Sequence, residues 1–429
     1  MQAAPTITGV TVVGGSSTIS SSTEVRISGS DLGVTGDTVV VTYDKAAGFA
    51  SKYTTGTCTL SATDIGHIIC PTVAGVGADL VFRVQVNGVT SGSSSNTVTY
   101  ARPAITNLAG SLSNTAGGTE ITLTGTSFGP ASHSEASATY GPSSSPNLYS
   151  VTSCTVDSDT QMRCDTVAGK GVDLQWTVTV GGQTPTSAYT AKKTSYLPPT
   201  ITSIVKTGGA GTLATAGTDT VDVGGTNFGP TCSGCITATY GGSAGTDYGS
   251  VTCDVTSANT AMVCNTVAGV GADHGWVVTV ESQASVKSTV TISYTAPAIT
   301  SVVKTGGAGT LATAGTDTVD IGGTNFGPTC TGCITATYGV NAGGTNYPAV
   351  GTLSCDVTSA NTAMVCNTVG GVGINHGWVV TVESQASAKS TATISYTAPA
   401  ITSVVKTGGA GTLATAGTDT VDIGGTNFG

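Results

Sequence analysis

Short stretches in which bulky apolar residues alternate with polar ones recur throughout the chain. In one of them, Trp176, Val178 and Val180 occupy alternate positions and threonines lie between them. Because successive side chains of a strand point to opposite faces, this pattern predicts a strand whose aromatic face is buried. The same pattern predicts equivalent strands at 82–86 and 276–280, and a second set of strands at 25–27, 121–123 and 221–223.

The segments between these strands are rich in Gly, Pro, Asn and Ser, and the chain shows no sustained 3.6-residue period. Such residues favour turns, whereas an amphipathic helix needs apolar residues every three to four positions. About seven short strands in about 100 residues are typical of a two-layer sandwich. We therefore predict an all-β fold.

A unit of about 100 residues is repeated along the chain, which is too long for a solenoid repeat and suits a string of small domains. Each copy opens with proline, a variable residue and isoleucine, at Pro5, Pro103, Pro199, Pro297 and Pro399. The repeat predicts domains at 1–101, 102–197, 198–296 and 297–398, followed by a partial domain at 399–429.

The final segment, residues 399–429, copies residues 297–327 letter for letter. It holds only the first strands of a unit, and an isolated pair of strands cannot bury a core. We expect either that the chain continues past Gly429 or that these strands complete a neighbouring subunit by donor-strand exchange.

The turn after the second strand has the sequence Gly-Thr-x-Phe-Gly at 125–129, 225–229 and 323–327. Together with the Pro-x-Ile opening, the second cysteine of each close pair and a closing tyrosine (Tyr100, Tyr294, Tyr396), this turn resembles the IPT/TIG domain. Domain 1 departs from the pattern, with Gly29-Ser30-Asp31-Leu32-Gly33. The resemblance implies a tandem array of immunoglobulin-like sandwiches, a fold of cell-surface receptors, bacterial surface proteins and some transcription factors.

The links between units are very short and carry proline, at 100–103, 196–199, 294–297 and 396–399. Proline fixes its own φ and favours an extended conformation for the residue before it. A flexible tether is instead longer and rich in Gly and Ser. We therefore predict semi-rigid joints and a stiff head-to-tail arrangement of domains.

Composition and charge exclude several partners. Charged residues make up 9% of the chain, the net charge is −10, and the 14 Lys and Arg residues do not cluster. Nucleic acids and anionic membrane surfaces are bound through clustered basic residues, so neither is expected. No apolar stretch is long enough to predict a membrane span.

The cysteines indicate an oxidising, extracellular compartment, because every complete unit holds an even number. Four close pairs suit disulfides between neighbouring strands: Cys58 with Cys70, Cys154 with Cys164, Cys253 with Cys264, and Cys355 with Cys366. Two Cys-x-x-Cys motifs, Cys232 with Cys235 and Cys330 with Cys333, are interpreted as small-loop disulfides. Zinc and thioredoxin-type redox sites are the weaker alternatives, because neither a second ligand pair nor a following helix is present.

No catalytic, cofactor or metal site is predicted. The Gly-x-Gly segments, such as 269–271, precede a strand and not a helix, so they are interpreted as tight loops and not as phosphate cradles. His274 follows Asp273, but neighbouring strand residues face opposite ways and no nucleophile motif accompanies them. Weak calcium binding is a minor alternative for Asp219, Asp222, Asp317 and Asp320, which lack a recognisable ligand spacing.

Attached sugars are expected to be O-linked, because the chain has no Asn-x-Ser/Thr acceptor. The alternative is that threonine is simply a soluble strand former. Candidate attachment residues are Ser20, Ser21, Ser143, Ser144, Ser145, Thr231 and Thr329.

These features predict a non-enzymatic structural protein of an extracellular or cell-surface fibril, which self-associates or continues covalently into a filament. The alternative is an adhesin or carbohydrate-binding stalk. A third class, the accessory domain of an enzyme, requires a catalytic domain outside residues 1–429.

Overall fold

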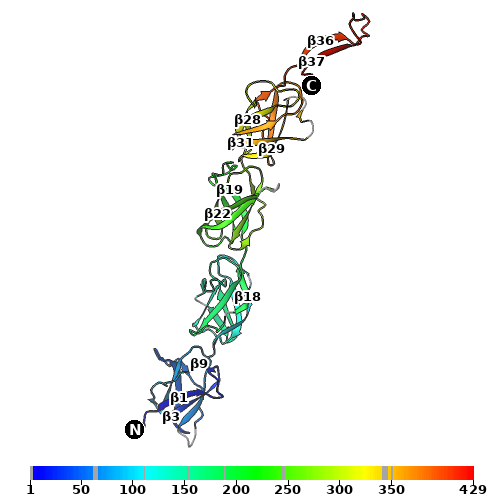
Figure 1. Ribbon diagram of the computed structural model, residues 1–429. Helices are drawn as coiled ribbons and strands as arrows, with labels where there is room; N and C mark the ends of the chain where they lie inside the picture. The colour runs from blue at the N-terminus through cyan, green and yellow to red at the C-terminus, as the bar shows by residue number, and fades with distance from the viewer. Residues whose placement is uncertain are drawn as a thin grey trace. The chain divides into compact units, whose positions relative to one another are not determined.

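The computed structural model describes residues 3–60, 66–110, 112–151, 154–187, 189–242, 247–340, 346–348 and 351–429. All regular elements in this part of the chain are β-strands (Figure 1). The chain divides into two compact units, one formed by Met1–Pro198 with Glu281–Gln283 and the other by Pro199–Val280 with Ala284–Gly429.

Domain 1 contains two antiparallel sheets, ordered β1-β3-β6 and β5-β4-β7-β8, and a short parallel pair, β2-β9. Its strands are β1 (Thr6–Val12), β2 (Thr18–Ile19), β3 (Glu24–Ser30), β4 (Val39–Lys45), β5 (Tyr53–Thr54), β6 (His67–Pro71), β7 (Leu80–Val86), β8 (Val89–Thr90) and β9 (Thr99–Tyr100).

Domain 2 has the same two layers, ordered β10-β12-β16-β15 and β11-β18-β17-β13-β14. Its strands are β10 (Ala104–Ala109), β11 (Leu112–Ser113), β12 (Glu120–Thr126), β13 (Ala136–Gly141), β14 (Tyr149–Val151), β15 (Cys154–Ser158), β16 (Gln161–Asp165), β17 (Leu174–Val180) and β18 (Tyr189–Tyr196).

In the second unit, domain 3 joins its layers into one ladder, β19-β20-β23-β22-β21-β24-β25, with β26 on β24. The long strand β22 pairs with β23 along one part and with β21 along another, so it crosses from one layer to the other. The strands are β19 (Thr200–Lys206), β20 (Thr220–Thr226), β21 (Cys232–Gly241), β22 (Asp247–Ser257), β23 (Ala261–Asn265), β24 (His274–Val280), β25 (Gln283–Ala284) and β26 (Thr291–Ile292).

Domain 4 follows the same path, β27-β28-β32-β31-β29-β33-β34, with β30 on β29 and β35 on β33. A separate hairpin, β36-β37, follows it. The strands are β27 (Ala298–Lys304), β28 (Thr318–Thr324), β29 (Cys330–Gly339), β30 (Asn346–Tyr347), β31 (Leu353–Ser359), β32 (Ala363–Asn367), β33 (His376–Val382), β34 (Gln385–Ala386), β35 (Thr393–Ile394), β36 (Ala400–Lys406) and β37 (Val421–Thr426).

The cores form where the alternation places them. On β17, Trp176, Val178 and Val180 are buried, and the residues between them are half-buried. The Trp176 ring stacks on Tyr140 of β13 with ring centroids 4.4 Å apart, and domains 3 and 4 repeat this pair. Such aromatic pairs contribute both area and specific geometry to a core. The predicted all-β, immunoglobulin-like fold is therefore confirmed.

The Gly-Thr-x-Phe-Gly turn has a physical explanation at each position. Phe128 is fully buried, and a Cβ on Gly125 would lie 2.5 Å from its Cζ atom. Ser127 has φ of 61°, in the left-handed region that side chains rarely adopt. Domain 1 forms the same turn despite its different sequence, because Asp31 has φ of 57° and Leu32 replaces the buried phenylalanine.

All twelve cysteines lie in the described part of the chain and are joined in six disulfides. In domains 2 to 4 the close pairs lie directly opposite each other on neighbouring strands, as with Cys253 on β22 and Cys264 on β23. Their Cα atoms are 4.1 Å apart. Each of these disulfides therefore links two strands of one layer and fixes their register.

The two Cys-x-x-Cys motifs, which have the same pattern in the sequence, differ in their burial. In domain 3, Cys232 and Cys235 form one disulfide and both pack against the core. In domain 4, Cys330 packs against the core, whereas its disulfide partner Cys333 is exposed. In both domains the register of the strand shifts between the first cysteine and the isoleucine that follows the motif, so the loop bulges out of the ladder. Both Cys-x-x-Cys motifs thus close small loops through disulfides.

Replacement of Cys253 and Cys264 by alanine is expected to lower the unfolding free energy of domain 3 by about 3 kcal/mol, because the loop they close no longer restricts the unfolded chain. Urea unfolding of the full chain under oxidising conditions measures the loss. The matched control is the Cys232→Ala, Cys235→Ala variant, which opens a shorter loop and is expected to lose less. Equal losses in the two variants would contradict this explanation.

Candidate functional site: the joint between domains

Within the first unit, Val76 of domain 1 packs into the core of domain 2. It lies between two glycines on the loop before β7, yet only 5% of its surface is exposed. It contacts the turn of domain 2 at Gly129, where an added Cβ would lie 2.2 Å from Val76 Cγ1. The last glycine of the Gly-Thr-x-Phe-Gly turn is therefore required for domain docking, in addition to its positive φ of 87°.

The second unit repeats this contact. Val270 of domain 3 packs against the core of domain 4, and a Cβ on Gly327 would lie 2.4 Å from Val270 Cγ1. The equivalent residue of domain 4, Val372, lies beside Gly429 at the end of the hairpin. We call Val76, Val270 and Val372 the plug valines. In domain 2 the same position holds Lys170.

A tyrosine holds each plug residue by both of its backbone groups. The Tyr53 hydroxyl accepts a hydrogen bond from the Val76 N–H (3.0 Å) and donates one to the Val76 carbonyl (2.9 Å). The Tyr248 hydroxyl makes the same pair of bonds with Val270, at 2.8 and 2.7 Å. This double hydrogen bond, which we call the tyrosine clamp, fixes the loop from inside the domain, so the plug is positioned before it meets its neighbour.

Two further tyrosines support the clamp. The Tyr43 and Tyr100 hydroxyls lie 2.7 Å apart, and Tyr100 donates to the Val73 carbonyl at 2.7 Å. The Val73 N–H in turn donates to Tyr43. Burial raises the pKa of both tyrosines, so both hydroxyls stay protonated and able to donate. The loop that carries the plug is thus bonded to the core at both ends.

A glutamine of the following domain binds the closing tyrosine of the preceding one. In the first unit, Gln183 Nε2 donates to the Tyr100 carbonyl at 3.2 Å, and in the second unit Gln385 Nε2 donates to the Tyr294 carbonyl at 2.9 Å. This bond, which we call the glutamine clasp, acts on the short proline link itself. It restricts rotation about the link, because the carbonyl belongs to the residue from which the link starts.

Charged groups add to the first joint. Lys52 of domain 1 pairs with Glu135 of domain 2. Burial opposes the charged form of Lys52, but its bonds to Glu135 and Tyr53 outweigh this effect and raise its pKa. Both side chains are more than a third exposed, so the pair contributes little to stability and mainly orients the two domains.

Two histidines lie behind the plug valines of the second unit. His274 is buried among Tyr240, Tyr248 and Tyr294, and its Nε2 donates to the Val270 carbonyl at 3.0 Å. Its Nδ1 is buried without a partner among the described residues. Burial lowers the pKa of His274, although the bond to Val270 partly opposes the shift. His376 repeats the arrangement beside Val372.

The carboxylates considered as calcium ligands take part in hydrogen bonds within their own domains. Asp219 accepts a hydrogen bond from the Ala214 N–H and pairs with Lys206, and these two contacts lower the pKa of its carboxyl group. Among the described residues, no group of three or more His, Cys, Asp or Glu side chains could hold a metal ion. The same part of the chain contains no helix suited to crossing a membrane.

The predicted O-glycosylation residues all lie at exposed positions: Ser20, Ser21, Ser143, Ser144, Ser145, Thr231 and Thr329. The plug valines, the clamp tyrosines and the clasping glutamines were not predicted from the sequence. The available signal was their recurrence, since Tyr53, Tyr149, Tyr248 and Tyr347 occupy the same place in each unit. Recurrence alone does not distinguish a joint residue from a core residue.

Acidification is expected to destabilise domains 3 and 4. The buried histidines have lowered pKa values, so below about pH 6.5 the unfolded chain binds protons that the folded domains resist, and stability falls as pH falls. Calorimetry of the full chain between pH 7.5 and about 5 measures this loss. The control is His274→Leu with His376→Leu, because domains 1 and 2 carry Leu80 and Leu174 there. Equal pH dependence in the two proteins would refute the explanation.

Comparison with known proteins agrees with the fold. Residues 103–193, within domain 2, match the family model described as IPT/TIG domain. No curated protein sequence matches the chain. A crystal structure with a xylogluco-oligosaccharide is 12% identical, with 78% of each chain covered and a TM-score of 0.25.

Two further structures have similar values. The plexin A4 extracellular region is 12% identical (TM-score 0.20), and the match covers 87% of this chain and 36% of the plexin chain. Invasin, described as a bacterial integrin-binding protein, is 15% identical, with 93% and 82% covered and a TM-score of 0.22. The chain consists of tandem immunoglobulin-like domains, and its residues 103–193 match the IPT/TIG domain family.

Proposed function

We propose that the chain is a structural segment of an extracellular or cell-surface fibril. The observation that carries the proposal is the repeated joint: a plug valine, a glycine turn and a clasping glutamine occur between domains 1 and 2 and again between domains 3 and 4. A chain whose domains only needed to be tethered would have no use for side chains shared between cores. The joints serve to fix the direction from one domain to the next.

Each joint stabilises a particular geometry by a modest amount. A buried valine side chain contributes about 1.5 kcal/mol and a buried hydrogen bond about 1 kcal/mol. These values are small beside the stability of a domain but large beside thermal energy. Each joint therefore limits bending while adding little to the stability of either domain.

The surface suits an extracellular location. Six disulfides are consistent with an oxidising compartment, and the low charge leaves hydroxyl groups to keep the surface wetted. O-linked sugars on the exposed serines and threonines, first of all Ser143, Ser144 and Ser145, extend this hydrated layer. In this role the chain needs no enzymatic activity or cofactor of its own.

The hairpin β36-β37 presents an apolar face through which we propose that chains associate. Val404, Leu413, Ile423 and Phe428 are each more than half exposed, whereas their counterparts in domain 4 are buried. Strands of a neighbouring chain cover this apolar face in the fibril.

Loss of a joint is expected to loosen two domains without unfolding either. Val270→Ser combined with Gln385→Ala removes the plug and the clasp between domains 3 and 4. Distances between spin labels at the exposed Thr256 and Thr358 should change from a narrow to a broad distribution, while the melting temperature of each domain changes little. The control is Val286→Ser, at a valine that is 88% exposed. A broad distribution in the unsubstituted chain would overturn the stiff-fibril proposal.

The exposed hairpin face is expected to bind the dye ANS and to promote self-association. A chain ending at residue 398 removes the hairpin and keeps the four complete domains. The ANS fluorescence and the sedimentation coefficient should both be lower than those of the 429-residue chain. The same dye binding by both chains would show that the apolar face lies elsewhere.

A further inference from the structure

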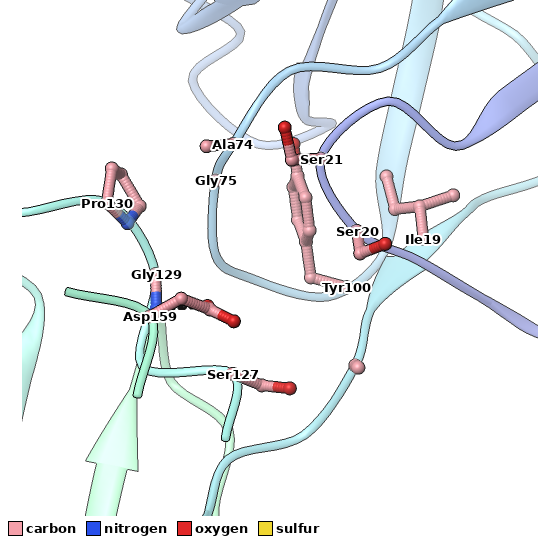
Figure 2. Close-up of a pocket in the computed structure, with 11 residues that line it drawn as sticks. Ile19, Ser20, Ser21, Ala74, Gly75, Tyr100, Ser127, Gly129, Pro130 and Asp159 are labelled. Carbon is pink, nitrogen blue, oxygen red and sulfur yellow. Dashed lines mark hydrogen bonds between the residues drawn. The ribbon is translucent and has the colours of Figure 1, made fainter. Parts of the chain in front are cut away.

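A cavity of about 340 Å³ lies at the joint between domains 1 and 2, inside the first unit (Figure 2). This volume is at the lower end of the range of about 300 to 1,000 Å³ for small-molecule sites. Domain 1 contributes Ser20, Ser21 and the edge of Tyr100 to its lining, and domain 2 contributes Ser127, Pro130 and Asp159. Figure 2 shows Asp159 and Ser127 pointing from domain 2 toward the segment of domain 1 that carries Tyr100 and Ser20.

The polar groups of the cavity are held in place from behind. Asp159 Oδ1 accepts a hydrogen bond from the Gly129 N–H at 2.9 Å, and its backbone carbonyl accepts from the Phe128 N–H at 3.0 Å. The carboxylate is thereby held by the turn that docks the plug valine, and the residue is exposed at the joint. Such preorganisation reduces the cost of ordering a binding site.

At the corresponding joint of the second unit, side chains form hydrogen bonds between the two domains. There Asn325 replaces Ser127, and its Nδ2 donates to the Ala296 carbonyl at 3.1 Å. The Thr215 hydroxyl donates to Asn325 Oδ1 at 3.3 Å, so the side chains close the gap between domains 3 and 4. Ser127 is too short to make these bonds, and it lines the cavity between domains 1 and 2.

Serine at this position is not favoured by the backbone. Ser127 has φ of 61°, and the equivalent Asn227, Asn325 and Asn427 have φ of 62°, 63° and 63°. Asparagine adopts this left-handed conformation more readily than serine. Asn361 likewise occupies the place of Asp159 and makes the same bond to a glycine N–H, at 3.1 Å, without the charge. The joint between domains 1 and 2 thus differs from the joint between domains 3 and 4 at two residues. Ser127 takes the place of an asparagine and is shorter, and Asp159 takes the place of an asparagine and carries a charge.

The lining selects a neutral ligand rich in hydroxyl groups. None of the described lining residues is basic, and the carboxylate repels anions. Sugar hydroxyls can donate to Asp159 and accept from Ser21 and Ser127, and the C–H face of a sugar can pack on Pro130. The lining is less suited to a cation, because Asp159 is the only carboxylate among the described lining residues.

We infer that the joint between domains 1 and 2 is a binding site for one hexose-sized sugar unit. Asp159 is the hydroxyl acceptor and Ser127 keeps the cavity open. Binding bridges the two domains and therefore stiffens this joint. The sugar site does not depend on the fibril proposal, because sugar binding is measured on the isolated chain and needs no filament.

Two substitutions taken from the second joint test the site. Saturation-transfer NMR on the full chain, produced without glycans, is run with glucose, galactose, mannose and N-acetylglucosamine. Binding of at least one of them is expected. Asp159→Asn keeps the bond to Gly129 and should weaken binding by about tenfold, because the charged acceptor is lost. Ser127→Asn should abolish binding and slightly raise the melting temperature, since it suits the positive φ.

The reverse exchange is the matched control. Asn325→Ser with Asn361→Asp should create sugar binding at the joint between domains 3 and 4. The inference is overturned if no sugar binds and none is attached there, if Ser127→Asn binds as well as the unsubstituted chain, or if calcium alone occupies the site.

The sugar can come from solution or from the chain itself, because Ser20 and Ser21 line the cavity and are candidate attachment residues. Mass spectrometry of native material identifies a glycan on either serine, and NMR contacts between that glycan and Tyr100 place it in the cavity. Binding of a free hexose by the unglycosylated chain identifies an external ligand. Either result supports the site.

Discussion

The structure depends on one interaction, the double hydrogen bond between a tyrosine hydroxyl and the backbone of the plug residue. Tyr53, Tyr149, Tyr248 and Tyr347 each accept from the N–H and donate to the carbonyl of a single residue. A loop between two glycines has many accessible conformations, and ordering it costs entropy. The tyrosine clamp offsets that entropy cost within one domain. It does so through a hydroxyl and two backbone groups that require hydrogen-bond partners when they are buried. The valine on the loop is therefore presented ready for docking.

The copies of the unit act as controls for one another. Where the plug is valine, the valine side chain leaves no room for a Cβ on the last glycine of the partner turn, as Gly129 and Gly327 show. Where serine replaces asparagine in the same turn, the joint opens a cavity. The backbone changes little between these cases, since the left-handed φ is kept in every copy. Differences in the joints therefore arise from single side chains on a constant frame.

The fold was accessible from the sequence, whereas the joints were only partly so. Alternation identified the buried face of β17 and β24, because strand side chains must alternate and the polar set stays outside. Val76 could not be recognised, because a valine between two glycines has the pattern of a loop residue and is buried only by its neighbour. Gln183 is equally uninformative alone, since its bond depends on the position of Tyr100 in the preceding domain. The proline links were visible, but the contacts that act on them were not.

The hairpin β36-β37 shows which features of the fold depend on local sequence and which depend on contacts with other strands. Its sequence is that of residues 297–327, and its register is also the same, from Ala400 opposite Thr426 to Lys406 opposite Val421, with the same bulge after the isoleucine. Its apolar residues nevertheless remain exposed, because the strands that bury their counterparts in domain 4 are not paired with it. Turn and strand chemistry thus suffice to set the pairing, and burial follows only when the second layer is added. The same order applies between domains: each loop is shaped by its own domain, and the next domain then covers it.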